Sequence, residues 1–588
     1  MFKKLIGSTL TAWLILVPAS LSIAAPAPGA SAAAAQNAPF SETSRAFLDA
    51  YWRAMPDAAI GAGKFDEAAR QDIPDEASRQ RTRDFATTWT ARLAQIDGAA
   101  LPPNQRTDLM LMKNELASIR WNLDTFRSYT WNPAEYNMSE SLDAIFNADY
   151  APLETRLRAI STRLANGPAY YSAAFASIAN PTREHTRLAM TQLPGAGSLL
   201  DSIGKAAQAS QLTASEKETF ALRLQQNHAA IDSYVAALTG LERQAPAGAR
   251  PFRIGKALYD AKFGYDIQSG FNAEQTYRRA LLAKEELLQR MQQLTDQLWP
   301  KYLANVAKPE GRAQRIKMLI DKMSENHVAR GALFEEVRRQ IPQLEQWVTS
   351  HDLLTLDPSH PLIVRETPVY KRGVAGASID APGPFQAQRA TYYNVTPIDD
   401  ETPEQAESFL REYNHWMMQI LNMHEAVPGH YVQLIHSNRS PSLIKSVFGN
   451  GAMVEGWAVY GERMMLESGY GGDTPEMWLM WSKWNLRSVT NTILDYSVHV
   501  LDMSEADVKS MLVNEAFQSD NEANGKWRRL QLTSVQLTSY FSGYSEIMAL
   551  RDEQKKALGA QFNQKKFHET FLSFGAAPVN VIRSLMQP

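Results

Sequence analysis

The sequence of 588 residues contains no cysteine. This absence excludes disulfide bonds, thiolate metal ligands and a cysteine nucleophile. It also excludes a lipid anchor attached to an amino-terminal cysteine. Any metal site in this chain must therefore use histidine, aspartate or glutamate side chains.

Basic residues are not in excess. Lysine and arginine total 60 against 63 aspartate and glutamate residues, and the formal net charge is -3. A protein that wraps nucleic acid needs an excess of cations to neutralise phosphates. We therefore expect no nucleic-acid partner.

Long apolar runs are missing after the amino-terminal segment, so no transmembrane helix is expected there. That segment reads MFKKLIGSTLTAWLILVPASLSIAAPAPGASAAAAQ, with Lys3 and Lys4 before an apolar stretch and small residues behind it. This order predicts a signal peptide over residues 1–24, with a second suitable cleavage site at residue 32. An uncleaved membrane anchor is the alternative, but glycine, threonine and proline interrupt the apolar stretch. We expect a periplasmic or secreted protein without stable membrane insertion after signal removal.

The length predicts at least two lobes, because a single hydrophobic core does not extend over so long a chain. Residues 25–39 are rich in alanine and proline and form a predicted disordered leader. We expect a helical lobe over residues 40–350 and a second lobe over residues 351–588. This size suits an enzyme with a deep cleft between two lobes.

Helix signals dominate residues 40 to 350. A capping box from Ser215 to Glu218 and an N-cap at Asn272 indicate two helix starts, and Pro300 indicates a helix end. The pattern predicts a mainly α, two-lobed helical body.

The residue pattern changes over residues 351–400, where prolines and glycines separate short β-branched and aromatic runs. ATYYNVT is the best strand candidate, so we expect a small β segment here. Thr402 as N-cap and Pro403 as first helical residue then predict a long helix that ends near the histidine motif.

Chemistry-bearing residues gather in the stretch HEAVPGH and beyond it. Four of the eleven histidines fall within residues 415–436, Glu425 directly follows His424, and Glu455 comes 25 residues after His430. In zinc peptidases, two histidines of one helix and a glutamate of the next hold the ion and leave one position for water. A glutamate beside the first histidine accepts the proton of that water.

The spacing departs from H-E-x-x-H, because the second histidine is six residues after the first. Residues six apart on a regular helix point about 240° apart, whereas residues four apart share a face. Pro428 must kink or end the helix, and Gly429 permits a bend that returns His430 to the face of His424. The ordinary alternative is a His-Glu pair of a helix surface or core followed by a Pro-Gly turn.

Further residues could support such a site. Glu462 lies seven residues after Glu455 on the same helix face and could orient a ligand histidine. Asp495 and His499 are four apart, so the carboxylate could orient the imidazole toward an oxyanion, and the Tyr540 phenol could serve the same purpose. The alternatives are a solvated glutamate, a structural histidine and an aromatic core residue.

The motifs HEAVPGHYVQ and EGWAVY resemble the bacterial family catalogued as domain of unknown function 885, which carries H-E-x-x-P-G-H-x-x-Q and then E-G-W-A-x-Y. The match includes Gln433, and the likeness extends over most of the chain. This family is similar to glutamate-ligand zinc peptidases with helical, two-lobed bodies and a deep channel. The resemblance implies a metallopeptidase-like catalytic lobe over residues 351–588, with Gln433 near the substrate.

Two downstream segments resemble the family less closely. NTILDYSVHV corresponds to R-L-V-V-D-T-G-L-H, with Asn491 in the arginine position and Ser497 in the glycine position. RLQLTSVQLTSYFSGY corresponds to R-Y-x-x-x-P-x-Q-A-x-x-Y-x-x-G, and Ser534 replaces the proline. These departures concern substrate preference, because an arginine near a cleft often binds a carboxylate.

The leading hypothesis is an exported peptidase with one Zn²⁺, or another divalent metal, bound by the two motif histidines and Glu455. Glu425 is the expected general base, and Tyr540 or His499 would stabilise the oxyanion. Short peptides are the expected substrates. Arg529 is a candidate to hold a substrate carboxyl terminus, which would make the enzyme a carboxypeptidase or dipeptidase.

Two other hypotheses stay open. One is a helical peptide-binding protein with a structural or vestigial metal site, although Glu425 would be needless in a closed site with four protein ligands. The other is a metal-dependent hydrolase of non-peptide amides or esters, since the same water chemistry serves both.

Overall fold

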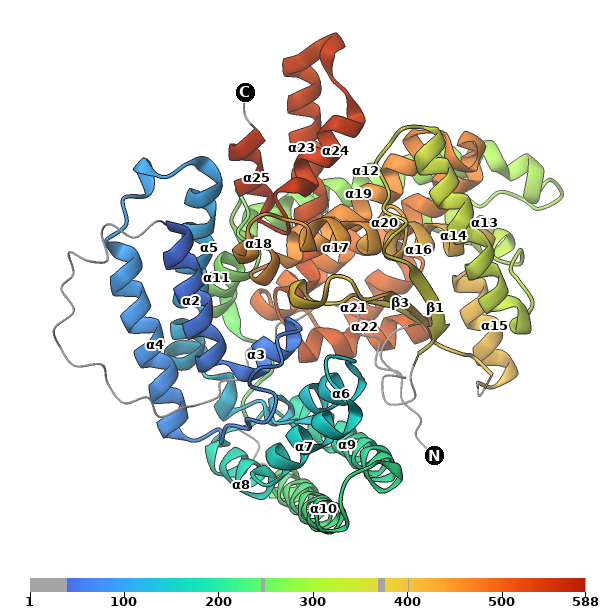
Figure 1. Ribbon diagram of the computed structural model, residues 1–588. Coiled ribbons are helices and arrows are strands. Elements are labelled where there is room, and N and C mark those ends of the chain that lie inside the picture. The colour runs from blue at the N-terminus through green and yellow to red at the C-terminus, as the bar shows by residue number, and fades with distance from the viewer. Residues whose placement is uncertain (1–39, 245–248, 368–375, 400, 587–588) are drawn as a thin grey trace. The chain divides into compact units, whose positions relative to one another are not determined.

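A computed structural model describes residues 40–244, 249–367, 376–399 and 401–586 (Figure 1). The predicted signal peptide and leader, residues 1–39, lie outside the described residues. Helices make up most of the described chain and strands form one small sheet, so the mainly α fold class is confirmed. Across the described residues, no helix is both long and apolar enough to cross a membrane.

The described chain forms two compact units. The first contains residues 40–252 and 383–386, and the second contains residues 253–382 and 387–586. The division lies at residue 252, earlier than the one expected at residue 350, because α12 (Ala273–Tyr302) packs along α20 (Pro475–Val500). The helices after residue 253 therefore belong with the histidine motif.

The first unit is entirely helical apart from its connections. Its α-helices are α2 (Phe40–Ala54), α3 (Pro56–Gly61), α4 (Glu76–Ala94), α5 (Pro103–Trp121), α6 (Ser139–Asn147), α7 (Leu153–Leu164), α8 (Gly167–Ser177), α9 (Arg183–Ala209) and α10 (Ala214–Gln244).

The second unit carries the remaining helices and the sheet. Besides α12 and α20, its α-helices are α11 (Gly255–Asp266), α13 (Arg312–Met323), α14 (Leu333–Ser350), α15 (Pro403–Glu412), α16 (His415–Glu425), α17 (His430–Asn438), α18 (Leu443–Val447), α19 (Gly451–Glu467), α21 (Glu505–Ser510), α22 (Asp520–Leu532), α23 (Ser539–Leu558), α24 (Gln564–Ser573) and α25 (Val579–Met586).

Helix starts follow the capping signals of the sequence closely. Asn272 caps α12, as expected, and it also forms a capping box with Gln275. The box predicted from Ser215 to Glu218 is wrong by two residues, because α10 begins at Ala214 and the reciprocal bonds join Thr213 and Glu216.

Pro300 does not end α12. The helix continues through the proline to Tyr302, so the proline lies within the last turn.

The long helix expected after Thr402 is two helices. Thr402 is the N-cap of α15, as predicted, and it also forms a capping box with Gln405. The chain then breaks at Asn414, whose side chain accepts hydrogen bonds from the amides of Trp416 and Met417 and begins α16. Asparagine competes for backbone groups in this way and therefore favours a new helix start over a helix interior.

The sheet supports the histidine helix. Strands β1 (Leu362–Glu366), β2 (Ala377–Asp380) and β3 (Thr391–Val395) lie in the order β1-β3-β2, with β1 parallel and β2 antiparallel to β3. β3 is the strand expected from ATYYNVT. The buried Tyr393 hydroxyl of β3 donates to Asn422 Oδ1 of α16 at 2.7 Å, and the Asn422 amide donates to Gln340 of α14 at 2.7 Å.

Helices α19 and α23 cross at two glycines. A Cβ atom at Gly543 would lie 1.7 Å from the carbonyl oxygen of Ala452, and one at Gly456 would lie 2.4 Å from the carbonyl carbon of Gly543. Only glycine permits such a close approach of two backbones. The crossing places the start of α23 beside the segment of α19 that carries Glu455.

Gly543→Ala is expected to lower the free energy of unfolding by about 2 kcal/mol or more, because the added methyl group must push α23 away from α19. Chemical denaturation followed by circular dichroism measures this change. Gly264→Ala is the matched control: Gly264 is exposed on α11 and its Cβ would meet nothing within 4 Å. The control should be neutral or stabilising by up to about 1 kcal/mol, and equal losses in both variants would contradict the tight crossing.

Candidate metal centre

The helix break expected at the Pro-Gly pair is present. His424 and Glu425 are the last two residues of α16, and His430 is the first residue of α17. The Val427-Pro428 peptide bond between the helices is cis. A Cβ atom at Gly429 would lie 1.8 Å from the carbonyl oxygen of His424, so no residue with a side chain fits there.

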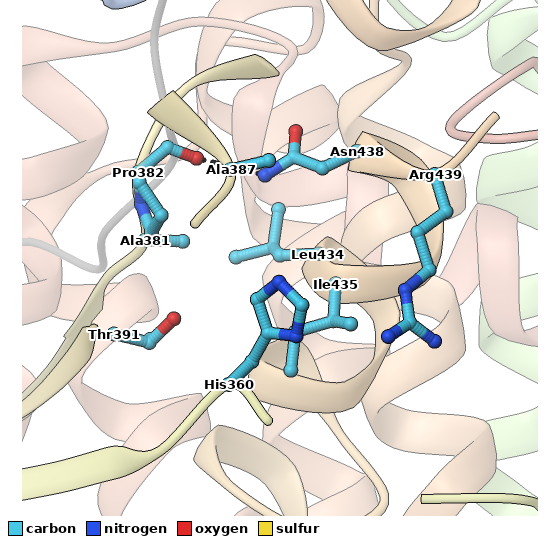
Figure 2. Close-up of a pocket in the computed structure, with 9 residues that line it drawn as sticks. All are labelled: His360, Ala381, Pro382, Ala387, Thr391, Leu434, Ile435, Asn438 and Arg439. Atoms are coloured by element: carbon cyan, nitrogen blue, oxygen red, sulfur yellow. Dashed lines mark hydrogen bonds between the residues drawn. The ribbon is translucent and has the colours of Figure 1, made fainter. Parts of the chain in front are cut away.

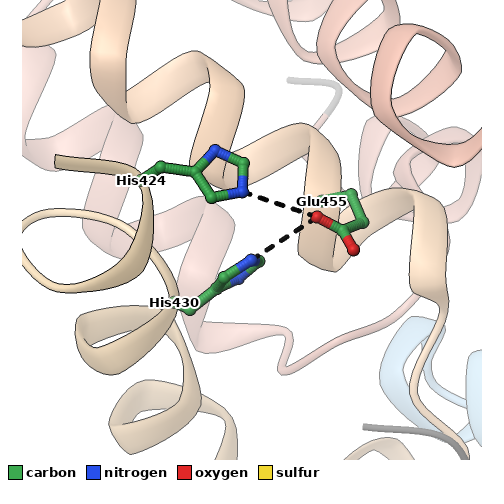
Figure 3. A group of neighbouring side chains, drawn as sticks. All are labelled: His424, His430 and Glu455. Carbon is green, nitrogen blue, oxygen red and sulfur yellow. Dashed lines mark ion pairs between the residues drawn. The ribbon is translucent and has the colours of Figure 1, made fainter. Parts of the chain in front are cut away.

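This break brings the two motif histidines together. Their ring centroids are 4.8 Å apart and the rings are nearly perpendicular. Nε2 of His424 lies 3.6 Å and Nε2 of His430 lies 3.4 Å from the same oxygen of Glu455 on α19 (Figure 3). One ligand atom from each of these three residues lies within 4.8 Å of the others.

The cluster is almost completely buried. Glu455 is 0% exposed, His424 4% and His430 6%. Neither carboxylate oxygen of Glu455 has a hydrogen-bond partner within the described part of the chain, and the same is true of Nδ1 of His430. A buried carboxylate without hydrogen bonds is costly unless a cation balances it.

Glu462 orients His424, in the place that its spacing from Glu455 predicted. Nδ1 of His424 lies 2.7 Å from Oε1 of Glu462, and the indole N–H of Trp484 on α20 donates to the same oxygen at 2.9 Å. Since the carboxylate occupies the Nδ1 side, Nε2 of His424 is the nitrogen that faces Glu455.

The mutual charges of the cluster shift its pKa values. Burial disfavours the imidazolium form of His424, but the facing carboxylates of Glu455 and Glu462 raise its pKa to about 10. Burial opposes ionisation of Glu455, yet the two histidines lower its pKa to about 2. Without a metal, the cluster therefore holds a proton on His424 against the Glu455 carboxylate at neutral pH.

Glu425 lies at the edge of this cluster. It is 7% exposed, and burial raises the pKa of its carboxyl while the nearby His430 and His424 lower it. Glu425 directly follows the ligand candidate His424 at the end of α16. A carboxyl group of raised pKa is better suited to accept a proton than an ordinary exposed glutamate.

Tyr540 and Arg529 also lie beside the centre. The Tyr540 ring is 6.4 Å from the His424 ring, with an angle of 21° between the planes. Nη2 of Arg529 is 3.4 Å from the Tyr540 hydroxyl oxygen, and the same nitrogen donates to Gln536. The structure thus places Tyr540 next to the cluster. Arg529 contacts Tyr540 and lies one residue further away.

His499 and Asp495 are engaged elsewhere. Nε2 of His499 lies 3.0 Å from the carbonyl oxygen of Leu530 and 2.9 Å from that of Thr533. The Nε2–H group therefore ties α20 to the end of α22 and does not face an oxyanion. Asp495 is 3.7 Å from this Nε2, and burial raises the pKa of its carboxyl to about 7.

Gln433 belongs to the packing between α17 and α19. Its amide nitrogen lies 3.4 Å from Oγ of Ser437 and 3.6 Å from the sulfur of Met453, and the side chain is 0% exposed. These contacts hold it inside the protein rather than toward a substrate.

Two tryptophans of the centre were not expected from spacing. Trp484 binds Glu462, and the Trp457 indole N–H donates to the carbonyl oxygen of Pro428 at 2.9 Å. Trp457 thereby fixes the turn that joins the two histidines. Its place within the EGWAVY motif was the only signal that could have found it.

A small pocket of the second unit lies apart from these residues. His360, Thr391, Leu434 and Arg439 are among the residues that line it, and it contains no member of the cluster (Figure 2). The pocket has room for little more than water, so we assign it no function.

The fold and the cluster define a mainly helical protein with a buried His-His-Glu centre. Residues 56–586 match the family described as bacterial protein of unknown function, DUF885. The chain belongs to this family.

Two solved structures are similar to it. A candidate lipoprotein of unknown function from Shewanella oneidensis is 49% identical, covers 93% of this chain and 100% of its own, and has a TM-score of 0.85. A candidate lipoprotein from Colwellia psychrerythraea, at 15% identity and a TM-score of 0.74 over 93% and 98% of the chains, shows the same fold. A comparison of the chain with the curated proteins found no match.

The metal-free cluster is expected to make stability depend on pH. The pKa of His424, about 10 in the folded chain, is above its unfolded value of about 6.5, so its contribution is complete below pH 6.5 and is lost as the pH rises through 10. The stability difference between wild type and His424→Gln, measured by thermal unfolding with a chelator, should shrink between pH 7 and pH 10. His436→Gln on α17 is the control, because burial lowers the pKa of His436. A constant difference for His424→Gln would contradict the assignment.

Proposed function

We propose that this protein is an exported, metal-dependent peptidase that hydrolyses short peptides. The observation that carries the proposal is the convergence of two imidazole nitrogens on a buried Glu455 carboxylate that has no hydrogen-bond partner within the described chain. One Zn²⁺ is the proposed ion, and other divalent metals would suit the same donor set.

The three side chains fit such an ion. Ligand atoms at about 2.0–2.1 Å from a tetrahedral zinc lie about 3.3 Å from one another. The two nitrogen-to-oxygen separations of 3.4 and 3.6 Å are close to that value. His424, His430 and Glu455 would hold the ion, and three protein ligands are typical of catalytic rather than structural zinc sites.

A bound zinc would supply Lewis-acid chemistry that activates water and polarises the scissile carbonyl. Residues of the chain would transfer the proton, orient the ligand histidine and stabilise the oxyanion. Glu425 would accept a proton at its carboxylate and pass it to the leaving amine. Glu462 would keep His424 in the required tautomer, and the Tyr540 hydroxyl would donate to the developing oxyanion.

Export is proposed on two grounds. The amino-terminal segment has the order of a signal peptide, and both similar solved structures are described as candidate lipoproteins. The 588 residues contain no cysteine for a lipid, so we propose a product that is free in the periplasm or secreted.

Two substitutions are expected to separate metal binding from turnover. His430→Ala should remove a ligand and abolish stoichiometric zinc binding. Glu425→Gln should keep about one zinc per chain and lower kcat/KM on a mixed peptide library by about 1,000-fold, because the proton acceptor is gone. Elemental analysis and mass spectrometry of the digested library measure the two effects.

The matched control is His436→Ala, which removes a histidine of the same helix outside the cluster. It should leave zinc content and turnover unchanged. Zinc retained in His430→Ala would refute the ligand assignment. Zinc without turnover of any peptide by the wild type would favour a peptide-binding protein, and hydrolysis of esters alone would favour a non-peptide hydrolase.

Glu462→Gln tests the support of the ligand histidine. The variant loses the charge that holds His424 in place and is expected to weaken zinc binding by about 10- to 100-fold. Competition with a chromogenic chelator measures the affinity. Glu467→Gln is the control, because Glu467 ends the same helix outside the cluster and pairs with Arg463 and Arg551. An unchanged affinity in Glu462→Gln would show that the contact is structural.

A further inference from the structure

Two cationic side chains of α22 are buried and have uncharged hydrogen-bond partners, and one of them contacts Tyr540. Nζ of Lys526 donates to Oδ1 of Asn491 at 2.6 Å, and Arg529 contacts Gln536 and the Tyr540 hydroxyl. Lys526 is 5% and Arg529 8% exposed. In the part of the chain that the structure describes, no ion pair joins either cation to a carboxylate.

Two carboxylates of the neighbourhood, one buried and one partly exposed, form ion pairs with other cations. Glu412 lies 2.9 Å from Nζ of Lys483, and Glu522 lies 2.5 Å from Nη2 of Arg487. Each of these two pairs is neutral by itself. They leave the charges of the two α22 cations to be balanced by another group.

Asp495 is the remaining nearby acid. Its burial raises the pKa of the carboxyl to about 7, although Lys262 and Arg529 lower it, so it is only partly ionised at neutral pH. Burial and the charges of Arg487 and Arg529 lower the pKa of Lys526, while the charge of Glu522 raises it. A region with this excess of buried positive charge is costly when empty and favours a bound anion.

The cations are close to the candidate metal centre. Tyr540 has its ring against His424 and its hydroxyl against Arg529, and Lys526 precedes Arg529 by one helical turn on the same face of α22. A ligand that reaches from the cluster past Tyr540 would therefore meet two adjacent cations.

We propose that Lys526 and Arg529 bind the free α-carboxylate of a peptide substrate, so that the enzyme releases short fragments from the carboxyl terminus. The inference rests on the proposed peptidase function. A guanidinium group binds a planar carboxylate through paired hydrogen bonds, and an ammonium group adds a point charge. Tyr540 lies between this site and the cluster, where the scissile carbonyl would lie.

The test compares two peptides of identical sequence, one with a free carboxyl terminus and one amidated. Wild-type, zinc-loaded protein should hydrolyse the free acid about 100-fold better in kcat/KM. Lys526→Met should lose about 100-fold on the acid with little change on the amide, whereas Lys526→Arg should keep the preference. Lys509→Met, which changes a partly exposed lysine of α21 that pairs with Glu505, is the control that should behave as wild type.

Calorimetric binding of both peptides to Glu425→Gln separates the two proposals. Selective binding of the acid without hydrolysis by the wild type would keep the carboxylate site and refute the peptidase. Equal hydrolysis or equal binding of acid and amide by proteins with intact Lys526 would overturn the carboxylate site, whether or not Lys526→Met folds. An unchanged acid preference in folded Lys526→Met would overturn the role of Lys526.

Discussion

The buried carboxylate of Glu455 is the constraint on which the centre depends. It has no hydrogen-bond partner within the described chain and faces two imidazole nitrogens at 3.4 and 3.6 Å. An isolated carboxylate in such a place would be too costly to remain ionised. The cation opposite it, a proton on His424 or a metal ion, is therefore part of the folded structure.

Glycines make this arrangement of helices possible. Gly429 lets the backbone pass within contact of the His424 carbonyl group, and Gly456 and Gly543 let α23 approach α19. The first glycine brings His430 to His424, and the other two bring Tyr540 to the same place. The close approach of the backbones thus brings the side chains of the centre together. A methyl group at any of these positions would separate them.

Sequence patterns of neighbouring residues predicted the local structure well. They did not predict contacts that depend on segments distant in the sequence. The Pro-Gly bend, the Thr402 cap and strand β3 follow from neighbouring residues, and Glu462 followed from a helical period. The break at Asn414 depends on a side chain that can cap as well as continue a helix. The contacts of His499 with the end of α22 depend on tertiary packing, which sequence spacing does not contain.

Opposite charges flank Tyr540, and this polarity gives the proposed enzyme a direction. On one side lie the carboxylates of Glu455 and Glu462, and on the other lie Lys526 and Arg529. A peptide bound with its carboxylate on the cations would place its uncharged amide bonds toward the cluster. Because an ammonium and a guanidinium group attract a free carboxylate far more strongly than an uncharged amide, the arrangement favours one orientation of the chain before any side chain of the substrate is recognised.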